Sequence, residues 1–118
     1  MSSSPLIGYE LERLVNESSC LMQVYRNELQ SGDQVIVKTL NSIYSIKVLE
    51  GGFYNVSGGW FDKQDLSPVK IKVSGCTWGG SIIKTDIIAA IDLCLEFGNN
   101  VITSRIEKIF IIPGNYKN

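Results

Sequence analysis

Residues 35–49 of this chain read VIVKTLNSIYSIKVL and contain the pattern that decides the fold. Two runs rich in β-branched residues, 35–40 and 43–49, flank the polar pair Asn41-Ser42. Apolar and polar side chains alternate in the second run, as expected for a strand with one buried and one solvated face. Two such runs joined by two turn-forming residues predict a β-hairpin.

The same period of two continues on the C-terminal side of this hairpin. Further strands are predicted at 53–56, 69–73, 93–97, 101–103 and 106–112. Residues 81–91 are ambiguous, because isoleucines at helical spacing oppose Ile-Ile pairs that favour strands, and strand is the preferred interpretation. The pattern predicts a mainly β protein, a small β-barrel or β-sandwich of six to eight short antiparallel strands.

An α-helix is predicted at the N-terminus, within a helical segment at 5–30. Ser4 can cap a helix that begins at Pro5. The apolar side chains at helical spacing are Ile7, Leu11, Leu14 and Val15. The stripe either continues to residue 30 or breaks at 16–19. We expect a single domain, 1–118, in which this helix packs on the β-rich body at 33–113 or pairs with another copy.

Composition excludes several classes of function. The chain has 118 residues, 44% of them hydrophobic, and a net charge of −1, which suits one folded core and gives no excess of basic residues for nucleic acid. It has no histidine, and its three cysteines form no Cys-x-x-Cys pair, so no metal site, cofactor or catalytic residue is predicted. The N-terminus lacks a secretory pattern and no segment could span a membrane, which predicts a cytoplasmic protein.

Two glycine-rich segments with aromatic side chains are the candidate binding sites. The first, 58–65, offers Trp60, Phe61 and Asp62, which could form a stacking surface with a polar group to orient a ligand. The structural alternative is that Trp60 and Phe61 plug one end of the β body, while the polar residues solvate the turn.

The second segment, 74–81, places Cys76, Thr77 and Trp78 among three glycines, where the backbone could approach a partner closely. A bulge or a tight corner between strands is the structural alternative. Cys76 would be the nucleophile of a thiol enzyme, but no histidine, and no lysine or arginine adjacent in sequence, is present to activate it.

These segments also carry a resemblance to a known group of proteins. The motifs are Ser42-Ile43-Tyr44, then 56–61, 75–81 and Thr103-Ser104-Arg105-Ile106, in that order. Over about residues 33–112 this succession resembles a family of small uncharacterised bacterial proteins. The resemblance brings no established activity, but it implies that the two glycine-rich segments are shared features.

The sequence therefore predicts a non-enzymatic module that binds a small molecule or a protein partner through the two glycine-rich loops. Its mechanism would be stacking on the indoles, which we expect at a common rim, with backbone hydrogen bonds from the turns. A self-associating structural protein, in line with an expected homo-oligomer, is the alternative. A small hydrolase-like or thiol enzyme is the third interpretation.

Overall fold

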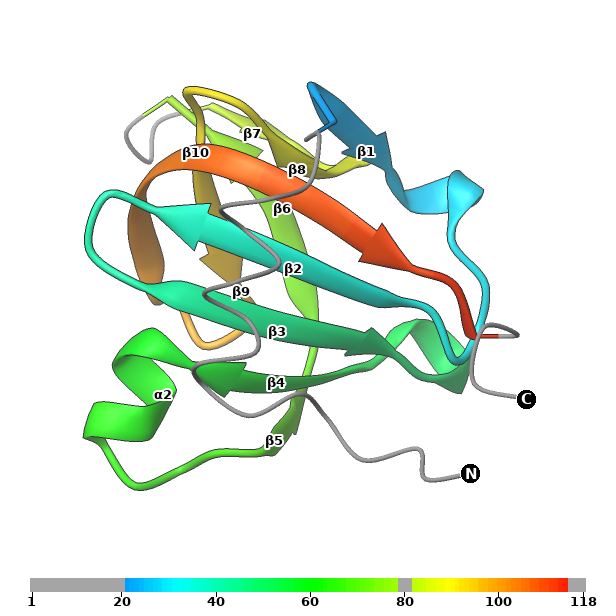
Figure 1. The fold of residues 1–118 in the computed structure, drawn as a ribbon, viewed down its shortest axis with the longest axis horizontal. Coiled ribbons are helices and arrows are strands. Elements are labelled where there is room, and N and C mark those ends of the chain that lie inside the picture. The colour runs from blue at the N-terminus through cyan, green and yellow to red at the C-terminus, as the bar shows by residue number, and fades with distance from the viewer. Residues whose placement is uncertain (1–20, 79–81, 115–118) are drawn as a thin grey trace.

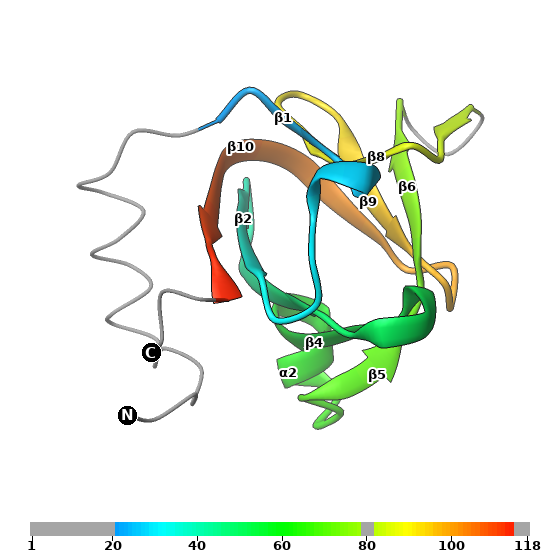
Figure 2. The same cartoon turned by 90° about the vertical axis from the view of Figure 1, so that its right-hand side faces the viewer.

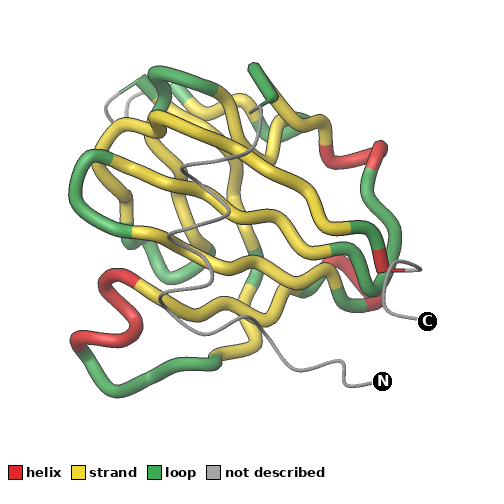
Figure 3. The backbone as a smooth tube through the Cα atoms, in the orientation of Figure 1, coloured by secondary structure: helices red, strands yellow, loops and turns green. Residues whose placement is uncertain are grey.

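The protein is mainly β, with ten antiparallel strands in two sheets, in a computed structural model that describes residues 21–78 and 82–114 (Figures 1 and 3). The strands are β1 (Gln23–Tyr25), β2 (Gln34–Thr39), β3 (Ile43–Val48), β4 (Tyr54–Gly58), β5 (Val69–Ile71), β6 (Val73–Thr77), β7 (Ile83–Lys84), β8 (Ile87–Ala90), β9 (Cys94–Phe97) and β10 (Ile102–Ile112). The helical elements among the described residues are η1 (Arg26–Glu28), η2 (Glu50–Gly52) and α2 (Gly59–Lys63).

Eight strands form one sheet in the order β5-β4-β3-β2-β10-β9-β6-β7, and β1 pairs with β8 in a second sheet. The large sheet curls strongly, as Figure 2 shows. Only Lys72 separates β5, at one end of the order, from β6, next to the other end. Because β5 and β7 do not pair with each other, the described part of the chain forms no closed barrel.

The predicted hairpin is present as β2 and β3. Its register places Val35 opposite Ile46 and Val37 opposite Tyr44, and all four side chains lie in the main hydrophobic core. Alternation along each strand produces this result, because every second side chain points to the same face of the sheet. The largest fully buried side chains of the main core are Phe61, Phe97, Ile46, Ile88, Leu95, Ile106 and Ile109.

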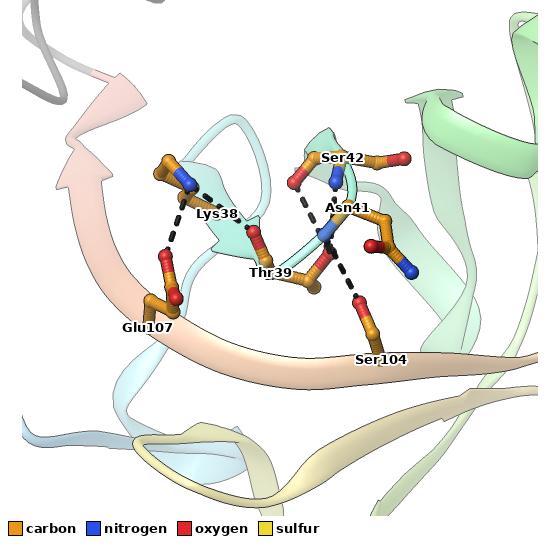
Figure 4. Close-up of polar contacts among 6 residues, drawn as sticks. All are labelled: Lys38, Thr39, Asn41, Ser42, Ser104 and Glu107. Atoms are coloured by element: carbon orange, nitrogen blue, oxygen red, sulfur yellow. Dashed lines mark hydrogen bonds and ion pairs between the residues drawn. The ribbon is translucent and has the colours of Figure 1, made fainter.

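The turn between β2 and β3 is fastened to β10 by polar contacts (Figure 4). The Thr39 hydroxyl accepts from the amides of Asn41 (3.3 Å) and Ser42 (3.1 Å), and the Asn41 amide also donates to Ser104 Oγ at 3.2 Å. Lys38 Nζ lies 3.0 Å from Glu107 Oε1. Since both partners of this ion pair are partly exposed, it contributes at most about 1 kcal/mol. The turn is also held by backbone hydrogen bonds, from the Thr39 amide to the Ser42 carbonyl (2.8 Å) and from the Leu40 amide to the Arg105 carbonyl (3.0 Å).

The predicted helical segment does not extend through residues 21–30, which form β1 and η1. Val24 is buried between exposed neighbours on β1, and β1 pairs with β8 in antiparallel register. This pairing with a strand more than sixty residues away overrides the local helical spacing. The earlier part of the predicted helix, with its apolar stripe, lies outside the described residues.

Two other strand boundaries differ from the sequence prediction. The run at 69–73 divides at Lys72 into β5 and β6, whereas 101–103 and 106–112 merge into the single strand β10. The preference for strand at 81–91 is confirmed for its described residues, which form β7 and β8. The described chain has ten strands, whereas six to eight were expected.

The guanidinium of Arg26 connects the two ends of the curled sheet. Its Nε and Nη2 atoms donate to the carbonyl of Thr85 at 2.9 and 2.7 Å. Nη2 also donates to the carbonyls of Val73 (3.0 Å) and Ser74 (3.3 Å), and Nη1 donates to Tyr54 Oη at 3.2 Å. One side chain thus joins η1, β4, β6 and the β7–β8 turn.

We predict that Arg26→Lys lowers the free energy of unfolding by about 2 to 3 kcal/mol, because one ammonium group cannot reproduce the planar set of donors. Urea unfolding followed by circular dichroism measures the change. Tyr54→Phe removes a single partner of Arg26 and is the matched control, with an expected loss of about 1 kcal/mol. Equal losses in the two variants would contradict this account of the contact.

Candidate functional site

The first glycine-rich segment forms a tight corner between β4 and α2. Gly58 has φ +100° and Gly59 has φ +45°, both in the region that glycine favours. A Cβ atom at Gly58 would collide with the carbonyl oxygen of Ile43, and one at Gly59 would collide with the ring of Tyr44. The pair of glycines is therefore required by the close approach of α2 to β3.

The side chains of α2 mostly pack or form hydrogen bonds within this corner. Phe61 is fully buried, and its ring centroid lies 4.8 Å from that of Phe97 in an edge-to-face arrangement. Trp60 is half-buried against Phe61, at 5.3 Å between centroids, and its amide donates to Tyr44 Oη at 3.2 Å. The exposed Asp62 accepts a 3.0 Å hydrogen bond from the Gly58 amide. This arrangement matches the aromatic plug considered from the sequence.

The second glycine-rich segment is a bulged strand, β6. Gly75 has φ +145°, lies at the register shift between β6 and β9, and would direct a Cβ atom into the carbonyl oxygen of Lys84. Cys76 and Thr77, which follow it, are fully buried. Their side chains are therefore closed to a ligand that approaches from solvent.

Cys76 has the environment of an inert thiol. Its Sγ donates to the carbonyl oxygen of Ile88 at 3.5 Å, and burial raises the pKa of the thiol to about 12. A nucleophilic cysteine needs the opposite shift, toward the thiolate. This geometry gives no support to the thiol-enzyme interpretation.

Trp78, directly after β6, has a very different environment, because its side chain is 67% exposed. Ile82 is 65% exposed and Ile83 is 37% exposed. Thr77 and Ile83 are cross-strand partners in the β6–β7 pair, so Trp78 and Ile82, their neighbours in sequence, lie at the end of that pair. We call Trp78, Ile82 and Ile83 the hairpin tip. Residues 79–81, which complete the predicted glycine-rich loop, lie outside the described residues.

The structure does not bring the two indoles to a common rim. Trp60 packs on Phe61, which contacts Phe97, and Phe97 pairs with Val73 at the start of β6. Trp78 follows the far end of β6, roughly 17 Å from Val73 at 3.3 Å per residue. Figures 1 and 2 agree, because α2 and β7 lie at opposite sides of the molecule. Only the hairpin tip presents a largely exposed indole.

Ile82 and Ile83 were not among the candidate residues from the sequence. In sequence they form part of an apolar run, which predicts burial as readily as exposure. The signal that could have found them is their short separation from Trp78 in the sequence. A short connection between two paired strands places the residues at both of its ends side by side.

No family model matches this chain, and the searches of curated proteins and of solved structures also give no match. The resemblance over residues 33–112 therefore stays a prediction. No group of three or more metal-ligating side chains occurs in the parts of the chain that the structure describes. No helix within those parts is long and apolar enough to cross a membrane.

We predict that Gly58→Ala lowers the free energy of unfolding by about 3 kcal/mol, through backbone strain and the collision with the Ile43 carbonyl. Gly52→Ala is the matched control: Gly52 also has positive φ (+82°), but a Cβ atom there meets nothing within 4 Å. Its expected loss is about 1 kcal/mol. Chemical denaturation of both variants is the measurement, and a Gly52 effect as large as that at Gly58 would refute the steric argument.

The raised pKa of Cys76 predicts a specific loss of stability in alkali. The folded state favours the neutral thiol, so this contribution is complete below pH 9.0 and is lost as the pH rises toward about 12. Between about pH 8 and about pH 10.5, the stability of the wild type should fall by about 2 kcal/mol more than that of Cys76→Ala. Urea unfolding at both pH values tests this, and parallel losses would exclude a buried neutral thiol.

Proposed function

We propose that this protein is a non-enzymatic module that binds a protein partner through the hairpin tip. The observation that carries the proposal is the 67% exposure of Trp78 beside Ile82 and Ile83. A large aromatic side chain left in solvent gains free energy when a partner covers it. Tryptophan is also among the residues that most often dominate the energetics of protein interfaces.

The base of the hairpin supports this role because it is held in place from several directions. The Arg26 guanidinium binds the carbonyls at the start of β6 and in the β7–β8 turn. The backbone of Gly75 packs closely against that of Lys84 on β7. A contact surface that is fixed before binding loses less conformational entropy on association.

A protein suits the hairpin tip better than a small molecule. Small-ligand sites are concave and bury most of the ligand surface. Here the protein itself supplies the projecting indole, so the complementary concave surface belongs to the partner. Of the six residues predicted from the sequence, we therefore assign the direct contact to Trp78 and its support to the buried Cys76 and Thr77 on β6. Trp60, Phe61 and Asp62 belong to the corner around α2 and have no part in this contact.

Self-association is the second candidate function, and the strand edges favour it. β5 and β7 are the terminal strands of the large sheet as described, so each has one edge without a partner strand in that sheet. Unpaired edges readily accept a further strand from another chain. A second copy bound at β7 would cover the hairpin tip as well.

The proposal is tested by replacing Trp78 with the photo-crosslinking residue benzoylphenylalanine in the full chain, within the cells that produce it. We expect one discrete adduct with a different protein, because a specific interface positions a single partner. Leu40 is 51% exposed and follows β2, which lies three strands from β6 in the sheet order, so it is the matched control position and should give no such adduct. An adduct of twice 13.1 kDa would identify a second copy instead.

The same partner then provides a quantitative check. Trp78→Ala should weaken its binding at least about tenfold, whereas Leu40→Ala should leave the affinity unchanged. Because Trp78 is mostly exposed, the variant should keep the circular dichroism spectrum of the wild type. Absence of any adduct at position 78, or equal adducts at 78 and 40, would overturn the proposed function.

A further inference from the structure

The outer face of the large sheet has a second hydrophobic cluster, separate from the main core. Ile36 on β2 and Phe110 on β10 are direct cross-strand partners. Val35 and Val37, the neighbours of Ile36, belong to the main core, so Ile36 points to the opposite face. Ile43 and Ile112 extend this cluster as partly buried members.

Polar side chains on the same face are also buried. Gln34 and Ser45 are only 3% and 6% exposed, and Gln34 Nε2 donates to Ser45 Oγ at 2.6 Å. We call Gln34, Ile36, Ser45 and Phe110 the outer patch. Ile36 is 0% and Phe110 is 5% exposed, which is the burial of an interior rather than of a surface.

The strands that carry the outer patch cannot bury it themselves, because a sheet face is closed only by a second layer. Among the described elements, none crosses this face of β2, β3 and β10 in Figure 1 or Figure 2. The hydrophobic side chains described as packing with Ile36 and Phe110 are Ile43 and Ile112, which lie on the same face of the sheet. The described elements therefore provide no cover for the outer patch.

The N-terminal part of the chain leaves the described structure at this place. The amide of Leu21, the first described residue, donates to the carbonyl of Ile109 at 2.9 Å, one residue from Phe110. A helix over 5–20 would measure about 24 Å at 1.5 Å per residue. The six residues of β2 span about 20 Å, so such a helix is long enough to cover the outer patch.

The sequence of this segment is complementary to the outer patch. Its predicted apolar stripe would face Ile36 and Phe110. Its charged residues are Glu10, Glu12, Arg13 and Glu17, a net charge of −2. The strands that frame the patch have Lys47 and Lys108 on this face, together with Lys38, which already pairs with Glu107. Charge and hydrophobicity thus point to the same occupant.

We propose that residues 5–20 of the same chain form an amphipathic helix that docks on the outer patch, through Ile7, Leu11, Leu14 and Val15. The docked segment forms the second layer over β2, β3 and β10. It leaves the hairpin tip uncovered, since the outer patch is built on other strands. The surface at Ile36 and Phe110 is therefore an intramolecular interface and is not available to a partner.

Hydrogen exchange of the full chain, followed by mass spectrometry, tests the proposal. We expect the amides of 7–15 to be protected in the wild type. A double variant, Leu11→Asp with Leu14→Asp, should accelerate their exchange at least about tenfold and lower the thermal midpoint, because the carboxylates cannot pack on Ile36 and Phe110. The same variant should bind the dye anilinonaphthalenesulfonate, which reports exposed apolar surface.

Asn16→Asp is the matched control, because it adds the same carboxylate to the opposite side of the predicted helix. It should retain the protection, the thermal midpoint and the low dye binding of the wild type. Unprotected amides at 7–15, or a double variant that behaves like Asn16→Asp, would overturn the proposal. Protection that changes with protein concentration over about a hundredfold range would also overturn it, because the occupant would then be a second copy.

Discussion

The guanidinium of Arg26 is the contact on which the arrangement of the sheets depends. It donates to carbonyl groups of β6 and of the β7–β8 turn and so ties these two segments together. Carbonyls without partners destabilise a fold when they are buried, and here a single planar cation donates to the part-buried carbonyls of Val73 and Ser74 and to the exposed carbonyl of Thr85. Its partners are neutral, so the interaction fixes geometry rather than pairing two charges. A short strand such as β7 can therefore keep its position at the end of a sheet.

Close backbone contacts at glycine explain why the two glycine-rich segments, which are similar in composition, have different roles. Around Gly58, the glycines allow α2 to pack against Tyr44, and the neighbouring aromatic rings complete the core. Around Gly75, the missing side chain lets β7 approach β6, and the next two side chains are buried. Trp78 takes part in neither of these close contacts and is mostly exposed. Its exposure is thus separable from the stability of the fold, as a binding residue requires.

Local patterns predicted the β2–β3 hairpin to within one residue, because alternation and a two-residue turn are encoded within the hairpin itself. They failed at Gln23–Tyr25, where the strand forms by pairing with β8 far along the chain. They also could not place Trp60 and Trp78 relative to each other, since that depends on which end of β6 each segment meets. The sequence pointed to Trp78 but not to Ile82 or Ile83. The burial of Phe61, Cys76 and Thr77 depends on long-range packing, which local patterns do not encode.

The molecule has two apolar surfaces outside its main core, and their physical settings differ. The outer patch is almost fully buried. It includes the hydrogen-bonded amide of Gln34 and hydroxyl of Ser45, and these polar groups would lose little free energy if they faced water. The hairpin tip is mostly exposed. A cover within the same chain is always at high effective concentration, so it would keep the outer patch closed to other proteins. A diffusing partner would then meet Trp78 first, and the docked segment would direct recognition to the hairpin tip by removing the competing surface.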